Sequence, residues 1–204
     1  MTVIRSYGHS CFSVEFDNGW VAVFDPYSNG SVPGLKLPKI TAAEVFSSHD
    51  HHDHNAVNLV RIAKRGFTPY NVETLVTDHD DEDGELRGKN RITILSNDKE
   101  KIVHFGDLGR ELTLAETFAL ADADVVMIPC GGHYTIDAET AKGIIWSISP
   151  KLAILMHYRT DKYGYKEISS IREVCEIIPE TDILDSSEVT LGTRTGVIAL
   201  TPIQ

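Results

Sequence analysis

The chain has 204 residues, 42% of them apolar and 24% charged, a composition that excludes a disordered chain and a coiled coil. This length suits a single domain over residues 1–204. Acidic residues outnumber basic ones by 30 to 19. The resulting formal net charge of −11 repels phosphate backbones, so we expect no nucleic-acid partner.

The sequence also lacks the signals of export and of membrane insertion. No apolar run approaches the ~20 residues that a membrane span needs, and no signal-peptide core follows Met1. The three cysteines form no paired motif, which argues against a disulfide framework and a thiolate zinc site. We therefore expect a cytoplasmic protein that acts on a small-molecule substrate, and the sequence is compatible with a homo-oligomer.

In chain order, most of the expected elements are short strands. The turn signal Asp17-Asn18-Gly19 predicts a hairpin between strands at 13–16 and 21–24. A polar segment at 97–100 predicts a second hairpin. Its strands are expected at 91–96 and 101–105, and further strands at 44–47, 72–77, 125–128, 152–156, 189–191 and 197–200.

Capping signals predict four helices between these strands. Two would run over 56–65 and 138–147, each preceded by an Asn or Asp that can cap it. The other two begin after Thr113 and Ser170, each of which has a glutamate three residues later, the pattern of a capping box. Strands interspersed with helices favour a layered α/β fold, in which a sheet packs on another sheet or on helices.

The most informative stretch is 48–55, which holds four of the nine histidines. On extended backbone, alternate residues point the same way, so His49 and His51 can converge on one point. As the chain turns into the expected helix, Asp53 and His54 are directed toward a second, adjacent point. Imidazoles and carboxylates together suit Zn²⁺, Fe²⁺ or Mn²⁺. The alternative is a solvated polar tract, but a position between an apolar strand and a helix favours a metal site.

Three more candidate ligands lie far from this stretch, and each follows an apolar run. They are His79, Asp107, which lies close to two glycines, and His157. The ends of strands are where functional sites of layered folds gather. Together with the histidine stretch, these residues predict a metal centre built from several strand ends.

The order H-x-H-x-D-H in this stretch resembles the metallo-β-lactamase superfamily of dinuclear metallohydrolases. The segments Gly8-His9-Ser10-Cys11-Phe12 and Phe24-Asp25-Pro26 are similar to the small "beta-lactamase-like" metal-dependent hydrolases, a subgroup near the L-ascorbate-6-phosphate lactonases. Residues 131–137 carry the same likeness. The resemblance implies an α/β (α+β) fold, namely a four-layered αβ/βα sandwich of two mixed sheets flanked by helices.

The resemblance also implies a role for each ligand. It assigns His49, His51 and His79 to a first metal, and Asp53, His54 and His157 to a second, with Asp107 bridging the two. It further assigns Asp25 to the support of the histidine loop. His104 competes with His79 for the third histidine position. We favour His79, because His104 lies inside a strand between two apolar residues and close to Asp107.

The expected activity follows from this assignment. Two divalent ions, most simply Zn²⁺ with Mn²⁺ or Fe²⁺ as alternatives, would lie ~3.5–4 Å apart and activate a shared hydroxide. Asp53 would act both as a ligand and as the catalytic residue that orients this hydroxide. The expected substrate is a small ester, lactone or phosphodiester, with an anionic one favoured. Two alternatives are a di-iron oxidoreductase, which typically has Glu where this chain has His51, and a metal-stabilised module without catalysis.

Other polar features give weaker indications. The acidic run 78–85 resembles a calcium loop, but the twelfth position of such a loop would be Asn90 instead of Glu. Arg87, just after this run, is a candidate for holding an anionic substrate group. Further candidate substrate contacts are His133 in a glycine-rich turn, and Tyr158 and Arg159 directly after His157.

Overall fold

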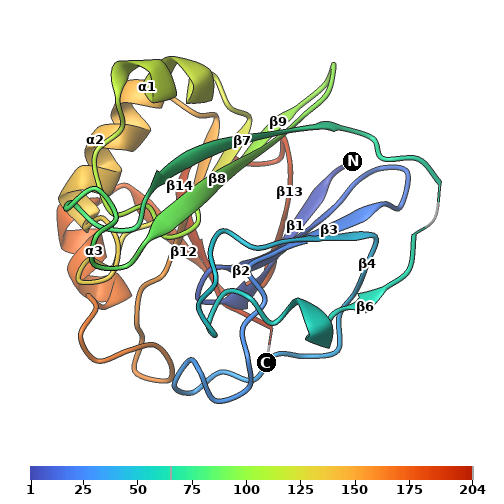
Figure 1. The fold of residues 1–204 in the computed structure, drawn as a ribbon. Coiled ribbons are helices and arrows are strands. Elements are labelled where there is room, and N and C mark those ends of the chain that lie inside the picture. Colours follow the sequence, from blue (N-terminus) through green and yellow to red (C-terminus); the bar gives the residue numbers. More distant parts are fainter. Residues whose placement is uncertain (65, 204) are drawn as a thin grey trace.

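The computed structural model describes residues 1–64 and 66–203, and two mixed β-sheets form the centre of the fold (Figure 1). The smaller sheet has the strand order β13-β1-β2-β3-β5. It consists of β1 (Val3–Gly8), β2 (Cys11–Glu15), β3 (Val21–Phe24), β5 (Glu44–Phe46) and β13 (Glu188–Thr190). Its neighbours pair antiparallel except for β3 and β5, which run parallel.

The larger sheet has seven strands in the order β12-β14-β11-β10-β9-β8-β7. They are β7 (Asn71–Asp78), β8 (Lys89–Ser96), β9 (Lys101–His104), β10 (Val125–Pro129), β11 (Leu152–Met156), β12 (Thr181–Leu184) and β14 (Gly196–Leu200). The strands β9, β10 and β11 are parallel neighbours, and β7 has the same direction because it pairs antiparallel with β8, which pairs antiparallel with β9. The carboxyl ends of these four strands therefore lie at one edge of the sheet.

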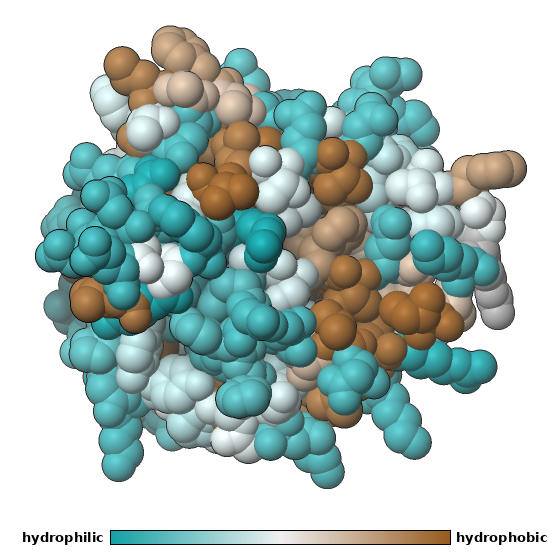
Figure 2. All heavy atoms as spheres, in the orientation of Figure 1, coloured by the Kyte–Doolittle hydropathy of each residue, from teal (hydrophilic) through white to brown (hydrophobic). Residues whose placement is uncertain are grey.

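Three α-helices lie together beside the larger sheet (Figure 1). They are α1 (Leu114–Leu120), α2 (Ala138–Ile148) and α3 (Ile171–Ile177). The predicted caps are confirmed: Thr113 and Ser170 begin α1 and α3 with capping boxes, and the Asp137 side chain accepts a hydrogen bond from the Thr140 amide. Figure 2 shows apolar side chains gathered over α1, a helix whose Leu114 and Phe118 are both exposed.

The core lies between the two sheets. Phe12 and Phe24 project from the smaller sheet and are buried, and both contact the His104 ring of β9 in the larger sheet. Phe105 and Met127 are fully buried as well. Burial of each such apolar side chain contributes about 1.5–3 kcal/mol. The predicted sandwich of packed sheets with flanking helices is thus confirmed.

Most of the predicted strands match the structure within two residues at each end, and both hairpins are present. No range was predicted for β1, and the strands β4 (Thr41–Ala42), β6 (Arg61–Ile62) and β12 were not expected. The predicted helix over 56–65 is wrong for its described residues. The chain there forms a short 3₁₀ turn, η1 (Val57–Leu59), followed by β6.

Two observations explain the missing helix. Asn55 does not cap this segment, since its side chain donates a hydrogen bond to Asp50. The amides of Arg61 and Ala63 donate instead to carbonyls of Ile40 and Ala42, so pairing with β4 satisfies the backbone. Three β-branched residues between 57 and 62 also favour a strand over a helix.

Candidate metal centre

The histidine loop, residues 48–55, connects β5 to η1 and separates its side chains into two groups. His49 and His54 are buried, whereas Asp50 and His52 face solvent. The turn that achieves this is closed by hydrogen bonds from the amides of His54 and Asn55 to the His51 carbonyl. Only part of the polar stretch therefore faces the interior.

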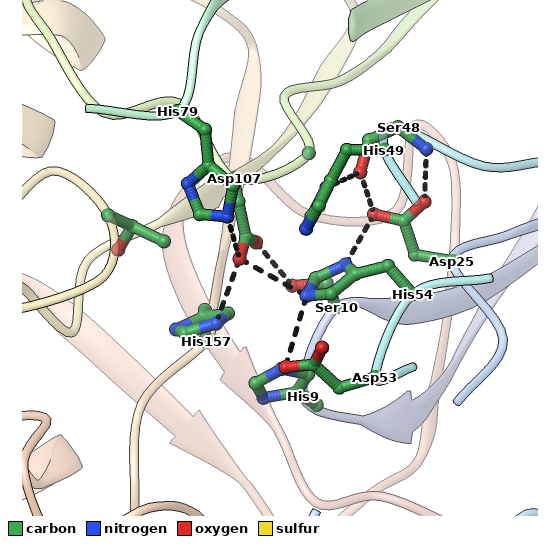
Figure 3. Close-up of polar contacts among 12 residues, drawn as sticks. His9, Ser10, Asp25, Ser48, His49, Asp53, His54, His79, Asp107 and His157 are labelled. Carbon is green, nitrogen blue, oxygen red and sulfur yellow. Dashed lines mark hydrogen bonds and ion pairs between the residues drawn. The ribbon is translucent and has the colours of Figure 1, made fainter. Parts of the chain in front are cut away.

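Asp25, directly after β3, lies beside Ser48 and His54 of the loop (Figure 3). Its carboxylate accepts hydrogen bonds from the Ser48 amide at 2.7 Å, the Ser48 hydroxyl at 2.6 Å and His54 Nδ1 at 2.8 Å. The Ser48 hydroxyl in turn accepts from His49 Nδ1 at 2.8 Å. With the protons on both Nδ1 atoms, the Nε2 atoms of His49 and His54 keep free lone pairs, as metal ligation requires.

His79 lies with His49 and His51. Possible ligand atoms of these three residues are all within 4.8 Å of one another. His104 is placed differently, because both of its ring nitrogens are occupied: Nε2 donates to the Ser10 carbonyl and Nδ1 accepts from the Gly106 amide. Its ring also stacks on Phe24 at 4.9 Å. His79, and not His104, is thus available as the third histidine of this group.

A second group of donors consists of Asp53, His54, His157 and His9, again with ligand atoms within 4.8 Å of one another. Asp107 lies between the two groups (Figure 3). Its Oδ2 is 3.1 Å from His54 Nε2, 3.2 Å from His157 Nε2 and 3.6 Å from His79 Nε2. One carboxylate oxygen therefore approaches ligands of both groups.

Two glycines allow Asp107 this position. A Cβ atom at Gly106, which has a φ of +56°, would lie 2.4 Å from Ser48 Cβ in the histidine loop. A Cβ atom at Gly109 would lie 2.2 Å from the carbonyl carbon of His79. Real Cβ atoms do not approach so closely, so glycine at both places lets the Asp107 turn lie against ligands from two other segments.

The donor set fits divalent cations. Within the described residues, the buried Nε2 atoms of His49, His54 and His157 have no hydrogen-bond partner, although Asp107 lies close to two of them. Imidazole nitrogens that converge on carboxylate oxygens without hydrogen-bond geometry are arranged as ligands around an ion. Six imidazoles with two carboxylates, Asp53 and Asp107, suit Zn²⁺, Fe²⁺ or Mn²⁺.

The charges of the site point the same way. Burial opposes the ionisation of Asp107, but His157 and His54 beside it hold its pKa well below the ordinary value. Burial also opposes ionisation of Asp25 and Asp53, and neighbouring histidines again outweigh it, so that both pKa values are lowered. Burial lowers the pKa of His49 to about 3. The pKa of His54 is raised, because Asp107 and Asp25 outweigh its burial. The carboxylates of Asp25, Asp53 and Asp107 thus gather at one buried site, and their negative charge favours bound cations.

His9 is a member of the second group that was not predicted as a site residue. It lies in the β1–β2 turn with a φ of 56°, and its Nε2 is 3.2 Å from Asp53 Oδ2. Its ring lies 4.0 Å from the ring of His157, whose amide donates to the His9 carbonyl. The next residue, Ser10, donates to Asp107 Oδ1 at 3.4 Å. The Gly8-to-Phe12 segment that carried the family resemblance was the available signal for this role.

A cleft of about 240 Å³ opens onto the two groups. It is lined by His51, Asp53, His79, Arg87, Asp107, Tyr134, His157 and Tyr165. Of the four predicted substrate contacts, only Arg87 lines it. His133 is exposed, and its neighbour Tyr134 faces the cleft instead. Tyr158 is buried and donates to the Leu200 carbonyl, and Arg159 donates to the Ile168 carbonyl and pairs with Glu173.

No helix in residues 1–64 and 66–203 is long and apolar enough to cross a membrane.

The sequence is similar to those of known metal-dependent hydrolases. The chain is 28% identical to a UPF0173 metal-dependent hydrolase of Archaeoglobus fulgidus, over 81% of this chain and 87% of that protein. It is 24% identical to a UPF0173 metal-dependent hydrolase of Thermoplasma volcanium, over 86% of this chain and 95% of that protein.

The fold is also similar to that of a solved member of the metallo-β-lactamase superfamily. A crystal structure from Thermotoga maritima, of a candidate Zn-dependent hydrolase of the metallo-β-lactamase superfamily, matches with a TM-score of 0.74 and 25% identity, covering 98% of each chain. The family described as the beta-lactamase superfamily domain matches residues 3–157. Because that match spans more than half of the chain, the protein belongs to the beta-lactamase superfamily, and its fold is that of the metallo-β-lactamases.

Proposed function

We propose that the protein is a metal-dependent hydrolase with a dinuclear metal centre, acting on a small ester, lactone or phosphodiester. The observation that carries this proposal is the position of Asp107, whose Oδ2 is within 3.6 Å of histidines from both donor groups. A carboxylate at such a position is suited to bridging two cations. The relatives are named metal-dependent hydrolases, which supports the reaction class.

The proposed ligands divide as the geometry suggests. His49, His51 and His79 would hold one cation, and Asp53, His54 and His157 the other, with Asp107 shared. We propose Zn²⁺ for both positions, since imidazole is the main donor. When bound, such ions lower the pKa of water toward ~7 and polarise the oxygen of an attacked carbonyl or phosphoryl group.

The protein's own residues would organise this chemistry. Asp53 belongs to the second donor group and also lies on the wall of the cleft, so its carboxylate can accept a proton or hydrogen bond from the attacking water. His9 Nε2 and the Tyr165 hydroxyl both lie within 3.2 Å of Asp53 Oδ2 and would fix its orientation. Asp25 would keep His49 and His54 in the ligating tautomer through the Ser48 and Nδ1 contacts.

Metal analysis combined with a substrate panel tests the proposal. Protein purified without chelator and supplemented with Zn²⁺, Mn²⁺ or Fe²⁺ should bind close to two equivalents per chain. It should then hydrolyse at least one member of a panel of aryl esters, lactones, thioesters and phosphodiesters. Failure to retain any of the metals would contradict the metal centre. Full loading without turnover of any panel member would contradict the hydrolase assignment.

A further inference from the structure

Arg87 differs in kind from every other side chain of the cleft. The remaining lining residues are histidines, tyrosines and the carboxylates Asp53 and Asp107, so Arg87 is the one permanently charged cation among them. It stands in a chain of net charge −11 and next to the acidic run 78–85. An arginine in such surroundings is expected to pair with a carboxylate unless its position prevents it.

The backbone of Arg87 is held in place by Asp80. This buried carboxylate accepts hydrogen bonds from the amides of Glu82, Gly84, Leu86 and Arg87, at 2.7–3.1 Å. The loop is closed further by a hydrogen bond from the His79 amide to the Gly88 carbonyl at 3.0 Å. The segment 80–88 therefore starts and ends beside His79, a candidate metal ligand. These hydrogen bonds hold the backbone of Arg87 at the edge of the cleft, which its side chain lines.

The nearby carboxylates are engaged elsewhere or face solvent. Asp78 pairs with Lys89 and with Arg110, and Arg110 also pairs with Glu116. Within the described residues, the Arg87 guanidinium has neither an ion pair nor a hydrogen bond to protein. It lies over the ring of Tyr134, at 5.8 Å from the ring centroid. The N–H donors of the Arg87 guanidinium are thus available to hydrogen-bond an anionic group of a bound molecule.

A wall of two tyrosines connects Arg87 to the metal centre. The ring centroid of Tyr134 is 5.6 Å from that of Tyr165, and the Tyr165 hydroxyl is 3.1 Å from Asp53 Oδ2. A hydrogen bond between the Tyr165 hydroxyl and the Ser31 carbonyl, at 2.8 Å, fixes the far end of this wall. A molecule lying on the two rings would have one end at Arg87 and the other at Asp53.

We propose that Arg87 binds an anionic group of the substrate that is separate from the scissile bond. The group is a carboxylate or a phosphate monoester, either of which matches the two-pronged geometry of guanidinium. The body of the substrate lies on Tyr134 and Tyr165, and the scissile bond reaches Asp53. The small volume of the cleft, about 240 Å³, limits the substrate to a compact molecule. This inference rests on the proposed hydrolase function.

Matched esters test the assignment in the metal-loaded protein. The probes are mono-4-nitrophenyl glutarate, 4-nitrophenyl 4-phosphonobutanoate and the neutral methyl 4-nitrophenyl glutarate. Replacing Arg87 by Gln should raise KM for the preferred anionic ester about tenfold or more, because charged hydrogen bonds are lost. The rise in KM should be much smaller for the neutral ester than for the preferred anionic ester, and Arg87→Lys should restore part of the loss. The two anionic probes distinguish a carboxylate from a phosphate site.

The control is Arg172→Gln, which removes the same charge from an exposed position on α3. It should leave all three KM values unchanged. Equal effects of the Arg87 and Arg172 variants, or equal effects of Arg87→Gln on charged and neutral esters, would overturn the assignment.

A binding measurement separates this inference from the proposed function. Calorimetric titration of the metal-loaded protein with glutarate and with 4-phosphonobutanoate should give about tenfold weaker binding of the preferred anion to Arg87→Gln than to the wild type. If that difference is found and no ester is hydrolysed, the hydrolase proposal fails and the anion site stands. If esters are hydrolysed and the two proteins bind both anions equally, the anion site fails alone.

Discussion

Two polar stretches of this chain look alike in composition and have opposite roles in the structure. The histidine loop at 48–55 and residues 80–85, the part of the acidic run that follows the ligand candidate His79, are both dense in groups that bind cations. In the first, side chains turn inward and their donor atoms meet those of other segments. In the second, Asp80 turns inward to organise its own loop and most of the others face solvent. Convergence of donors from distant segments, and not local charge density, distinguishes a metal site.

The most decisive test of this contrast is to change one carboxylate of the metal centre and one of the acidic run. Asp107→Asn keeps the shape of the side chain but removes the charge that would offset two cations in a desolvated cleft. We expect the loss of one metal equivalent and a fall in hydrolysis by several orders of magnitude, with the circular dichroism spectrum unchanged. Asp81→Asn, in the acidic run, should alter neither metal content nor rate. Equal losses in both variants would show that general acidity holds the metals.

A second test compares two buried histidines, His79 directly after β7 and His104 at the end of β9. His79→Ala should weaken metal binding in the first group and leave the second largely occupied. His104→Ala should retain both metals but lower the free energy of unfolding by about 1–3 kcal/mol, because the Ser10 carbonyl loses its donor. Metal content by mass spectrometry and urea denaturation measure the two effects. Loss of a metal from the His104 variant would reverse the assignment.

The role of His9 can be isolated in spite of its left-handed backbone. Asn tolerates a positive φ better than most residues, so His9→Asn removes the imidazole contact to Asp53 with little added strain. We expect metal affinity of the second group to fall about 10–100-fold, as for other residues that orient ligands. Competition with a chromophoric chelator measures this. An unchanged affinity would mean that Asp53 needs no support from the β1–β2 turn.

The acidic run makes its own prediction. Asp80→Ala leaves four backbone amides of the 80–88 loop without their acceptor, which should cost about 1–3 kcal/mol of stability. Metal content should stay at the wild-type level, since the donors of Asp80 are loop amides. Thermal unfolding and metal analysis of the same sample give both values, with Asp81→Ala as the control. A fall in metal content without a fall in stability would contradict the contrast between the two stretches.

The smallest expected effect on stability concerns the ion pair between Arg110 and Glu116. A hydrogen bond from Arg110 lowers the pKa of Glu116 to about 2, against the opposing effect of burial and with help from Thr113. Because the folded pKa is below the ordinary value of 4.5, the stabilisation is fully present above about pH 4.5 and is lost as the pH falls toward 2. Glu116→Gln should cost about 1 kcal/mol at pH 7 and flatten this part of the acid unfolding profile. An acid unfolding profile of Glu116→Gln identical to that of the wild type would show that the Arg110–Glu116 ion pair does not contribute to stability.

Local patterns predicted the elements whose stability is local. Hairpin turns and helix caps depend on neighbouring residues, so the β2–β3 hairpin and the start of α2 were predicted correctly. The segment 56–65 failed because its backbone pairs with β4, a strand some twenty residues away in sequence. The spacing of apolar residues within a segment does not reveal whether a marginally stable helix or pairing with a strand distant in sequence has the lower free energy.

The same distinction applies to the site. The spacing within 48–55 and the strand-end positions of His79, Asp107 and His157 predicted residues that the fold brings together. Of the four residues predicted as substrate contacts, Arg87 lines the cleft and the other three do not, because local turns decide which side chain faces it. His133 and His157 both have left-handed backbone, with φ of 60° and 55°. These turns expose His133, direct Tyr134 into the cleft and send Tyr158 into the core.

The origin of the ligands in two different sheets has a consequence for folding. His49, Asp53 and His54 follow the smaller sheet, whereas His79, Asp107 and His157 follow strands of the larger one. Cations held by both sets would fasten the two halves of the sandwich to each other across their common edge. Binding free energy then adds directly to folding free energy, by RT ln(1 + [M]/Kd) for each site when the unfolded chain does not bind. Without cations, the carboxylates at this seam repel one another. With the proposed metal centre, the stability of the protein would depend on the metal supply of its surroundings, independently of any substrate.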